Sequence, residues 1–137
     1  MKLFVNIVLW LLQLLLAAQF LFHGWFFLFP PEQYIDMLNT QFPVWFRLFL
    51  GVAEVAAGIG LILPGVTRIL PEFVPLAALG IMIVTASASV LHFSHGGVET
   101  RSGIWTIGLF VIASFVAYMR WKVQPIVPRR ETERLAN

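Results

Sequence analysis

The sequence contains no cysteine and few charged residues. Without cysteine, a disulfide, a cysteine-ligated zinc site, an iron–sulfur cluster and a thiol redox relay are all excluded. Charged residues make up 12% of the 137 residues, against about 25% in an ordinary soluble domain, whereas 59% are hydrophobic. So few charged residues cannot cover the surface of a water-soluble protein of this length. The composition therefore predicts a protein that is embedded in a lipid bilayer.

Basic charge is concentrated near the end of the sequence. The net charge is only +2, and most of the basic excess lies in residues 122–137, so nucleic-acid binding has no support. We expect these residues to form a polar cytoplasmic tail that follows a transmembrane domain of residues 1–121. The arginines of the tail could rest on anionic lipid headgroups, but Glu131 and Glu133 among them weaken that interpretation.

Long apolar runs dominate the rest of the chain. Four are long enough to cross a hydrocarbon core, which takes about 20 helical residues: 3–29, 43–63, 73–93 and 104–121. None alternates polar with apolar residues, so they are predicted to be helices and not barrel strands. Helix-breaking residues separate them, namely Pro30-Pro31, Pro43, Pro64-Gly65 and Gly96-Gly97. The predicted fold class is all-α, and the short connections favour an antiparallel bundle of four transmembrane helices.

The distribution of lysine and arginine predicts the orientation of this bundle. Seven of the nine basic residues fall on one side of the predicted membrane: Lys2, Arg68, Arg120, Lys122, Arg129, Arg130 and Arg134. Arg47 and Arg101 fall on the other side. Because basic residues favour the cytoplasmic side, we expect both the N- and the C-terminus to be cytoplasmic, in a multi-pass protein of a bacterial inner membrane.

The second apolar run carries an acidic residue deep in the predicted membrane. Residues spaced by four, three and four positions share one face of this helix: Arg47, Gly51, Glu54 and Gly58. At about 1.5 Å per residue, Glu54 lies about 16 Å from Pro43, near the bilayer midplane. An ionisable group at that depth is a candidate for function, so Glu54 is a candidate proton carrier. It could pair with Arg47, remain protonated, or bond a polar group on another helix.

Two other predicted helices offer polar residues at a similar depth. Gln19 and His23 lie four apart in the first run, and Thr85, Ser89 and His92 form a stripe along the third. We expect these residues to converge with the polar face of the second run and to form a ligand-binding pocket in the outer half of the bundle. The alternative is that they only bond the helices to one another, as polar residues in membranes commonly do.

No metal or haem site is predicted. His23 and His92 differ by about 8 Å in estimated depth, which disfavours their ligation of a single haem. His95 and Glu99, in the outer loop, are fewer than the three or four ligands that a metal site requires. We therefore expect no covalent cofactor.

Residues 47–64, RLFLGVAEVAAGIGLILP, resemble the second helix of the DoxX and DoxX-like membrane proteins. The shared pattern is a small residue, a glutamate, a glycine and a closing proline, here Gly51, Glu54, Gly58 and Pro64. The four-helix plan and the chain length also match that family. The resemblance implies a small membrane protein associated with quinone-linked oxidoreductases and redox-stress assemblies. Some redox-associated relatives carry cysteine pairs, and the lack of cysteine here excludes a thiol-transfer role.

Three functions remain open from the sequence. In the first, the bundle binds a quinone or quinol as a subunit or anchor of a membrane redox complex. Glu54 would then move a proton, His23 would bond a quinone oxygen, and Arg47 would stabilise negative charge, while Gly51 and Gly58 would leave room for the ring. The electron donor would lie on a partner protein, so we do not expect an enzyme in this chain alone.

The other two functions involve no redox chemistry. One is a non-catalytic scaffold or assembly factor for other membrane proteins, and the other is a small-molecule transporter. Four helices give little room for alternating access, and no pair of broken helices is evident, so transport would require a homo-oligomer.

Overall fold

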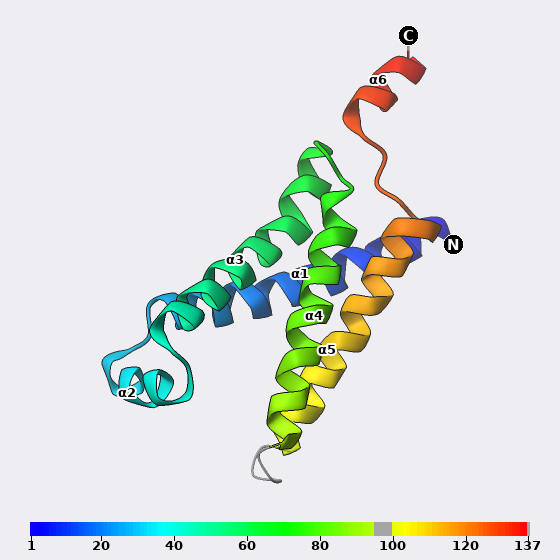
Figure 1. The fold of residues 1–137 in the computed structure, drawn as a ribbon. Helices are drawn as coiled ribbons and strands as arrows, with labels where there is room; N and C mark the ends of the chain where they lie inside the picture. The colour runs from blue at the N-terminus through cyan, green and yellow to red at the C-terminus, as the bar shows by residue number, and fades with distance from the viewer. Residues whose placement is uncertain (95–99, 137) are drawn as a thin grey trace.

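The structure, a computed structural model, describes residues 1–94 and 100–136, without the side chains of residues 91, 92, 94, 100, 101, 133, 135 and 136. Figure 1 shows its helical segments in chain order: α1 (Lys2–Leu28), α2 (Glu32–Gln41), α3 (Val44–Thr67), α4 (Phe73–Ser94), α5 (Thr100–Tyr118), the π-helix η1 (Met119–Val123) and α6 (Arg129–Ala136). Among the described residues, four segments are long and apolar enough to cross a membrane: Lys2–Leu28, Val44–Thr67, Phe73–Val90 and Ser102–Val123. The prediction of an all-α fold with four transmembrane helices is confirmed. The predicted break at Gly96-Gly97 lies outside the described residues.

Helix α3 continues past Pro64, where the sequence predicted its end. Proline lacks one backbone donor, but in the last turn this removes a single helical bond, so the helix tolerates it. The helix ends at Arg68, whose left-handed backbone (φ 56°, ψ 22°) turns the chain toward α4. The prediction that Pro64 ends the helix was therefore wrong by one turn.

The segment between the first two transmembrane helices is more than a short connection, because it contains α2. Glu32 lies in the first turn of α2, where the negative charge of a carboxylate interacts favourably with the helix dipole and stabilises the helix. Leu38 is its one buried residue, and the ring of Tyr34 contacts that of Phe26 of α1 at 5.5 Å between centroids. The helix therefore lies against the end of the α1/α3 pair, as Figure 1 shows.

Helices α1 and α3 form a close antiparallel pair. A Cβ atom on Gly24 of α1 would lie 2.8 Å from the carbonyl oxygen of Gly51 of α3. Farther along, a Cβ on Gly58 of α3 would lie 2.7 Å from Cγ of Leu21 of α1. Small residues allow such close approach of helices in a membrane, where packing and not hydrophobic exclusion drives association. The glycines therefore bring the two helices into contact.

Helices α4 and α5 form the second antiparallel pair. A Cβ on Gly103 of α5 would lie 2.7 Å from the ring of Phe93 of α4, and Ser89 Oγ lies 2.8 Å from Thr106 Oγ1. The two pairs meet at one end, which holds the start of α1, the turn between α3 and α4 and η1; we call it the closed end. Toward α2 and the first turns of α5 the pairs diverge, and we call that the open end (Figure 1).

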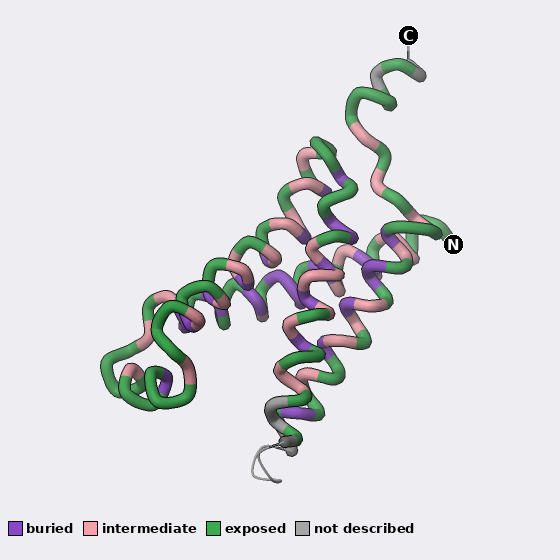
Figure 2. The backbone as a smooth tube through the Cα atoms, viewed as in Figure 1, coloured by how far each residue is buried: buried purple, intermediate pink, exposed green. Residues whose placement is uncertain are grey.

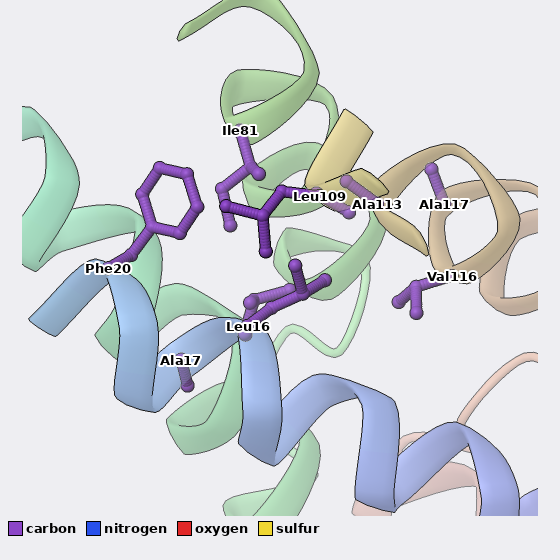
Figure 3. Close-up of a cluster of buried hydrophobic side chains, with 10 residues drawn as sticks. Leu16, Ala17, Phe20, Ile81, Leu109, Ala113, Val116 and Ala117 are labelled. Carbon is purple, nitrogen blue, oxygen red and sulfur yellow. The ribbon is translucent and has the colours of Figure 1, made fainter. Parts of the chain in front are cut away.

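An apolar core joins the two pairs where they cross. Figure 3 shows this cluster, in which the larger side chains Leu16, Phe20, Ile81 and Leu109 meet small ones such as Ala113. The buried positions in Figure 2 lie mainly on the facing sides of the helices, whereas the outward faces carry exposed apolar side chains such as those of residues 11, 22, 49 and 83. This distribution suits helices whose outer surface faces lipid.

Candidate functional site

A groove of about 920 Å³ lies between the two helix pairs. The polar side chains that line it are Gln19, His23, Glu54, Thr85, Ser102 and Thr106. Apolar walls come from α1, α4 and α5 and include the aromatic rings of Phe20 and Trp105. A volume of several hundred cubic ångströms, apolar walls and a few convergent polar groups are typical of a small-molecule site.

The polar centre of the groove is a pair formed by His23 and Glu54. His23 Nδ1 lies 2.7 Å from Glu54 Oε2, and the Glu54 side chain is only 3% exposed whereas that of His23 is 47% exposed. Among the three ways in which Glu54 could be stabilised, the structure therefore has the bond to a polar group on another helix. The imidazole also forms a T-shaped contact with the ring of Phe27, with 4.6 Å between centroids.

This arrangement leaves one imidazole nitrogen available. Among the described residues, His23 Nε2 has no hydrogen-bond partner, while Nδ1 is held by the carboxylate. A carboxylate bonded to one nitrogen of a neutral histidine fixes the tautomer and the orientation of the ring, and it leaves the lone pair of the other nitrogen free to accept. The pair can therefore accept a hydrogen bond or a proton from a hydroxyl group in the groove, or return one.

Arg47 does not pair with Glu54. It is buried, and its Nη1 donates to the carbonyl oxygen of Phe27 in the last turn of α1. The last carbonyls of a helix lack partners within that helix and carry partial negative charge, so a cation there is favourable. Arg47 thus ties α3 to the end of α1, and it does not line the groove as the sequence led us to expect.

Gly51 and Gly58 also lie away from the groove. A Cβ on Gly51 would meet Cγ of Leu28 at 2.8 Å, and Gly58 contacts α1 in the same way. The expectation that these glycines leave room for a ligand ring does not fit this placement. Their neighbours are side chains and backbone atoms of α1, so their role here is close helix packing.

The polar stripe of α4 divides between two roles. Thr85 and Gln19 line the groove, Gln19 from the facing helix α1. Ser89 does not line it; its hydroxyl bonds Thr106 of α5 and the carbonyl oxygen of Thr85, the latter at 2.7 Å. The side chain of His92 lies outside the described part of the structure, as do His95 and Glu99.

A second polar cluster, at the closed end, was not predicted. Arg120, which the sequence pattern assigned to the cytoplasmic surface, is 3% exposed. Its Nε donates to Gln13 Oε1 at 2.6 Å, and its Nη1 donates to Asn6 Oδ1 at 2.8 Å. The sequence did contain a signal for this cluster. Asn6, Trp10 and Gln13 are spaced by four and three residues and so share one face of α1, where polar groups can meet another helix.

Comparison with known proteins supports the resemblance noted in the sequence. The model of the DoxX-like family matches residues 11–118, a range that includes all the residues lining the groove. Neither the curated proteins nor the solved structures provide a match.

Proposed function

The chain belongs to the DoxX-like family, and from this premise we propose that its groove binds the headgroup of a quinone or quinol in the service of a membrane redox complex. The observation that supports this proposal best is the His23–Glu54 pair, in which a half-exposed imidazole facing the groove is bonded at 2.7 Å to a buried carboxylate. A hydroxyl or carbonyl oxygen on a flat, apolar ring is the kind of group that such a pair and such walls can bind.

The proposed chemistry places the proton on His23. Oxidation of a quinol releases two protons and two electrons. In the groove, His23 Nε2 would accept one of the two protons from the bound hydroxyl, and Glu54 would balance the positive charge of the imidazolium across the 2.7 Å contact. The other hydroxyl of the quinol would release the second proton to water. The electrons would pass to a redox group of a partner protein, so in this proposal the chain is a subunit and not an enzyme by itself.

The walls of the groove suit the rest of such a ligand. Phe20 and Trp105 provide aromatic surface, and Gln19 and Thr85 provide polar groups from two different helices. The groove lies among segments that can span a membrane, so a lipid-soluble molecule can reach it from the bilayer between the diverging pairs. In this proposal Arg47 and the two glycines act only through helix packing.

The proposed setting follows the distribution of basic residues. We place the protein in a bacterial inner membrane with both termini on the cytoplasmic side, as the seven basic residues on that side predict. The closed end would then face the cytoplasm, and the groove would open toward the outer leaflet.

Direct binding tests this proposal. A short-chain quinone is titrated into the purified protein in lipid nanodiscs, and the dissociation constant is measured by calorimetry for the wild type and for His23→Gln and Glu54→Gln. We expect saturable binding that weakens about tenfold in each variant, the equivalent of about 1.4 kcal/mol, because His23→Gln removes the imidazole and Glu54→Gln removes the charge that supports it. Glu32→Gln, which changes an exposed carboxylate of α2, is the matched control and should bind as the wild type does.

Two results would count against the proposal. One is the absence of saturable quinone binding to the wild type. The other is equal binding by all four proteins, which would place the quinone elsewhere. Either result, together with partner proteins that co-purify with the wild type and Glu54→Gln alike, would favour the scaffold or assembly-factor role instead.

A further inference from the structure

The closed end holds a buried cation whose hydrogen-bond partners among the described residues are neutral. Arg120 is 3% exposed, and its partners are the amide oxygens of Gln13 and Asn6 and the carbonyl oxygen of Gln124, at 2.6, 2.8 and 3.4 Å. The ring of Trp10 lies beneath the guanidinium, with 5.5 Å from Cζ to the ring centroid. Among the described residues, no carboxylate pairs with it.

One nitrogen of this guanidinium has no partner at all. Arg120 Nη2 is buried and without a hydrogen-bond partner in the described structure. A buried charge is costly unless a counter-charge compensates it, and an unpaired buried donor adds its own desolvation cost. The network therefore holds the cation in place with neutral acceptors but leaves its charge and two N–H groups uncompensated.

We propose that Arg120 binds a single oxyanion, a phosphate group, at the closed end of the bundle. A guanidinium is well suited to this role because its planar fork of donors matches the geometry of phosphate oxygens. Trp10, Gln13 and Asn6 fix the guanidinium in position, so little side-chain entropy remains to be lost when the anion binds. The site is independent of the groove, which lies in the other half of the bundle.

The anion would reach Arg120 by displacing residue 124. The bond from Arg120 Nη1 to the carbonyl oxygen of Gln124, at 3.4 Å, is the longest that the guanidinium makes. Among the described residues, the Gln124 side chain bonds the carbonyl oxygen of Lys2, at 3.2 Å and in an exposed position. Gln124 directly follows η1, and π-helical turns are frequent at functional sites. The backbone N–H of Gln124 donates to the carbonyl oxygen of Met119 at 2.7 Å, so the anion would displace the Gln124 carbonyl from Arg120 Nη1 without unfolding the end of η1.

Two sources can supply the phosphate. Arg120 lies in a membrane-spanning segment close to its end at Val123, where the headgroup of an acidic phospholipid can reach it. Exposed Lys2 and Lys122 are close in sequence to this network and would attract such a lipid. The other source is soluble phosphate, which offers the same oxygens without an acyl chain.

The test compares a lipid with its neutral counterpart and with the free anion. The delipidated full chain is mixed with phosphatidylglycerol, phosphatidylcholine or inorganic phosphate, and retained ligands and the Tm are measured by native mass spectrometry and thermal unfolding. For a lipid source we expect one retained phosphatidylglycerol, a raised Tm and no such effect of phosphatidylcholine. For a soluble source, inorganic phosphate alone should raise the Tm as much as phosphatidylglycerol does.

The sharpest variant is Asn6→Asp, because it keeps the size of the side chain and places a carboxylate against Arg120 Nη1. The new carboxylate should stabilise the fold and compete with the anion, so retention and the Tm rise on ligand addition should both be lost. Arg130→Gln, a change of an exposed basic residue outside this network, is the control and should retain the ligand. The proposal is overturned if Asn6→Asp responds as the wild type does, or if neither phosphatidylglycerol nor phosphate raises the Tm of the wild type.

Discussion

The two ends of the bundle use buried polar groups differently. At the closed end, Arg120 and Gln13 join three segments, because Arg120 of η1 reaches Asn6 and Gln13 of α1 while Gln13 donates to the carbonyl oxygen of Leu61 of α3 at 2.8 Å. At the open end, the pair of His23 and Glu54 joins only α1 to α3, and its imidazole is half-exposed in a groove.

This difference separates polar groups that mainly bond other helices, with Arg120 Nη2 as the exception, from polar groups that face a groove. Most polar atoms of the closed end are hydrogen-bonded between helices. Removing them should therefore lower the free energy of unfolding. The open end has one helix pair on each side of the groove, and the stability of each pair comes from close packing within it. Its polar groups can therefore be changed at a lower cost to the fold.

Removing Arg120 should have the largest effect. Arg120→Ala deletes the charged donor and leaves the buried oxygen of Gln13 without its partner, so we expect a loss of about 3 kcal/mol in the free energy of unfolding. Unfolding by sodium dodecyl sulfate in mixed micelles measures it. Lys122→Ala, on the same turn but exposed, should change the stability by less than about 0.5 kcal/mol. Equal losses of unfolding free energy in Arg120→Ala and Lys122→Ala would contradict the claim that the buried polar groups of the closed end stabilise the fold.

Filling the contact between α1 and α3 should have the next largest effect. In Gly24→Ala the new Cβ would lie 2.8 Å from the Gly51 carbonyl oxygen and 2.9 Å from the Val55 amide nitrogen, and neither backbone atom can move aside alone. We expect a loss of about 2 kcal/mol, as for overpacked cores. Gly80→Ala is the control, because nothing lies within 4 Å of its Cβ position. If the same unfolding assay gives both variants wild-type stability, the close pairing of α1 with α3 is wrong.

An isosteric change in the groove should cost little stability. Glu54→Gln keeps the shape of the side chain and can still bond His23, so we expect a change of less than about 1 kcal/mol in the free energy of unfolding. The same assay, run beside Arg120→Ala, measures the contrast between the two ends directly. A loss of unfolding free energy as large as that of Arg120→Ala would mean that Glu54 serves mainly to stabilise the fold and not to support ligand binding.

The smallest effect concerns the link between α4 and α5. Ser89→Ala removes the 2.8 Å bond to Thr106, and such bonds in membranes contribute about 0.6 kcal/mol on average. A double-mutant cycle with Thr106→Ala isolates this pair in unfolding measurements. A coupling energy near zero would show that the two hydroxyls bond only the carbonyls of their own helices.

Much of the fold could be predicted from the sequence because the bilayer restricts the choices. Long apolar runs can cross it only as helices when no alternating pattern is present, and this made the four spans and their order predictable. Pro64 misled the prediction because a proline signal does not distinguish the last turn of a helix from its end. The helix α2 was missed because its sequence, EQYIDMLNTQ, is mostly polar. With one buried residue it lacks the repeated apolar positions that indicate an amphipathic helix.

The candidate site was predicted in part, and the errors share a physical cause. His23, Gln19, Glu54 and Thr85 could be grouped because each is polar at a similar depth, and the structure brings them to one groove. Arg47, Gly51 and Gly58 were grouped with Glu54 because they share its face of α3. Helix α1 covers that face on either side of Glu54, so these three residues contact α1 and not the groove. The cluster around Arg120 was missed because a basic residue near a membrane boundary ordinarily indicates the cytoplasmic surface.

Native mass spectrometry of the protein extracted in a mild detergent tests the central claim most directly, with the wild type beside Glu54→Gln. The groove at the open end is predicted to hold a small lipid-soluble ligand, so the wild type should carry an adduct of quinone mass that is absent from Glu54→Gln, while both proteins remain folded. If both proteins carry only phospholipids or other proteins, the His23–Glu54 pair serves helix packing and the proposed quinone site is contradicted.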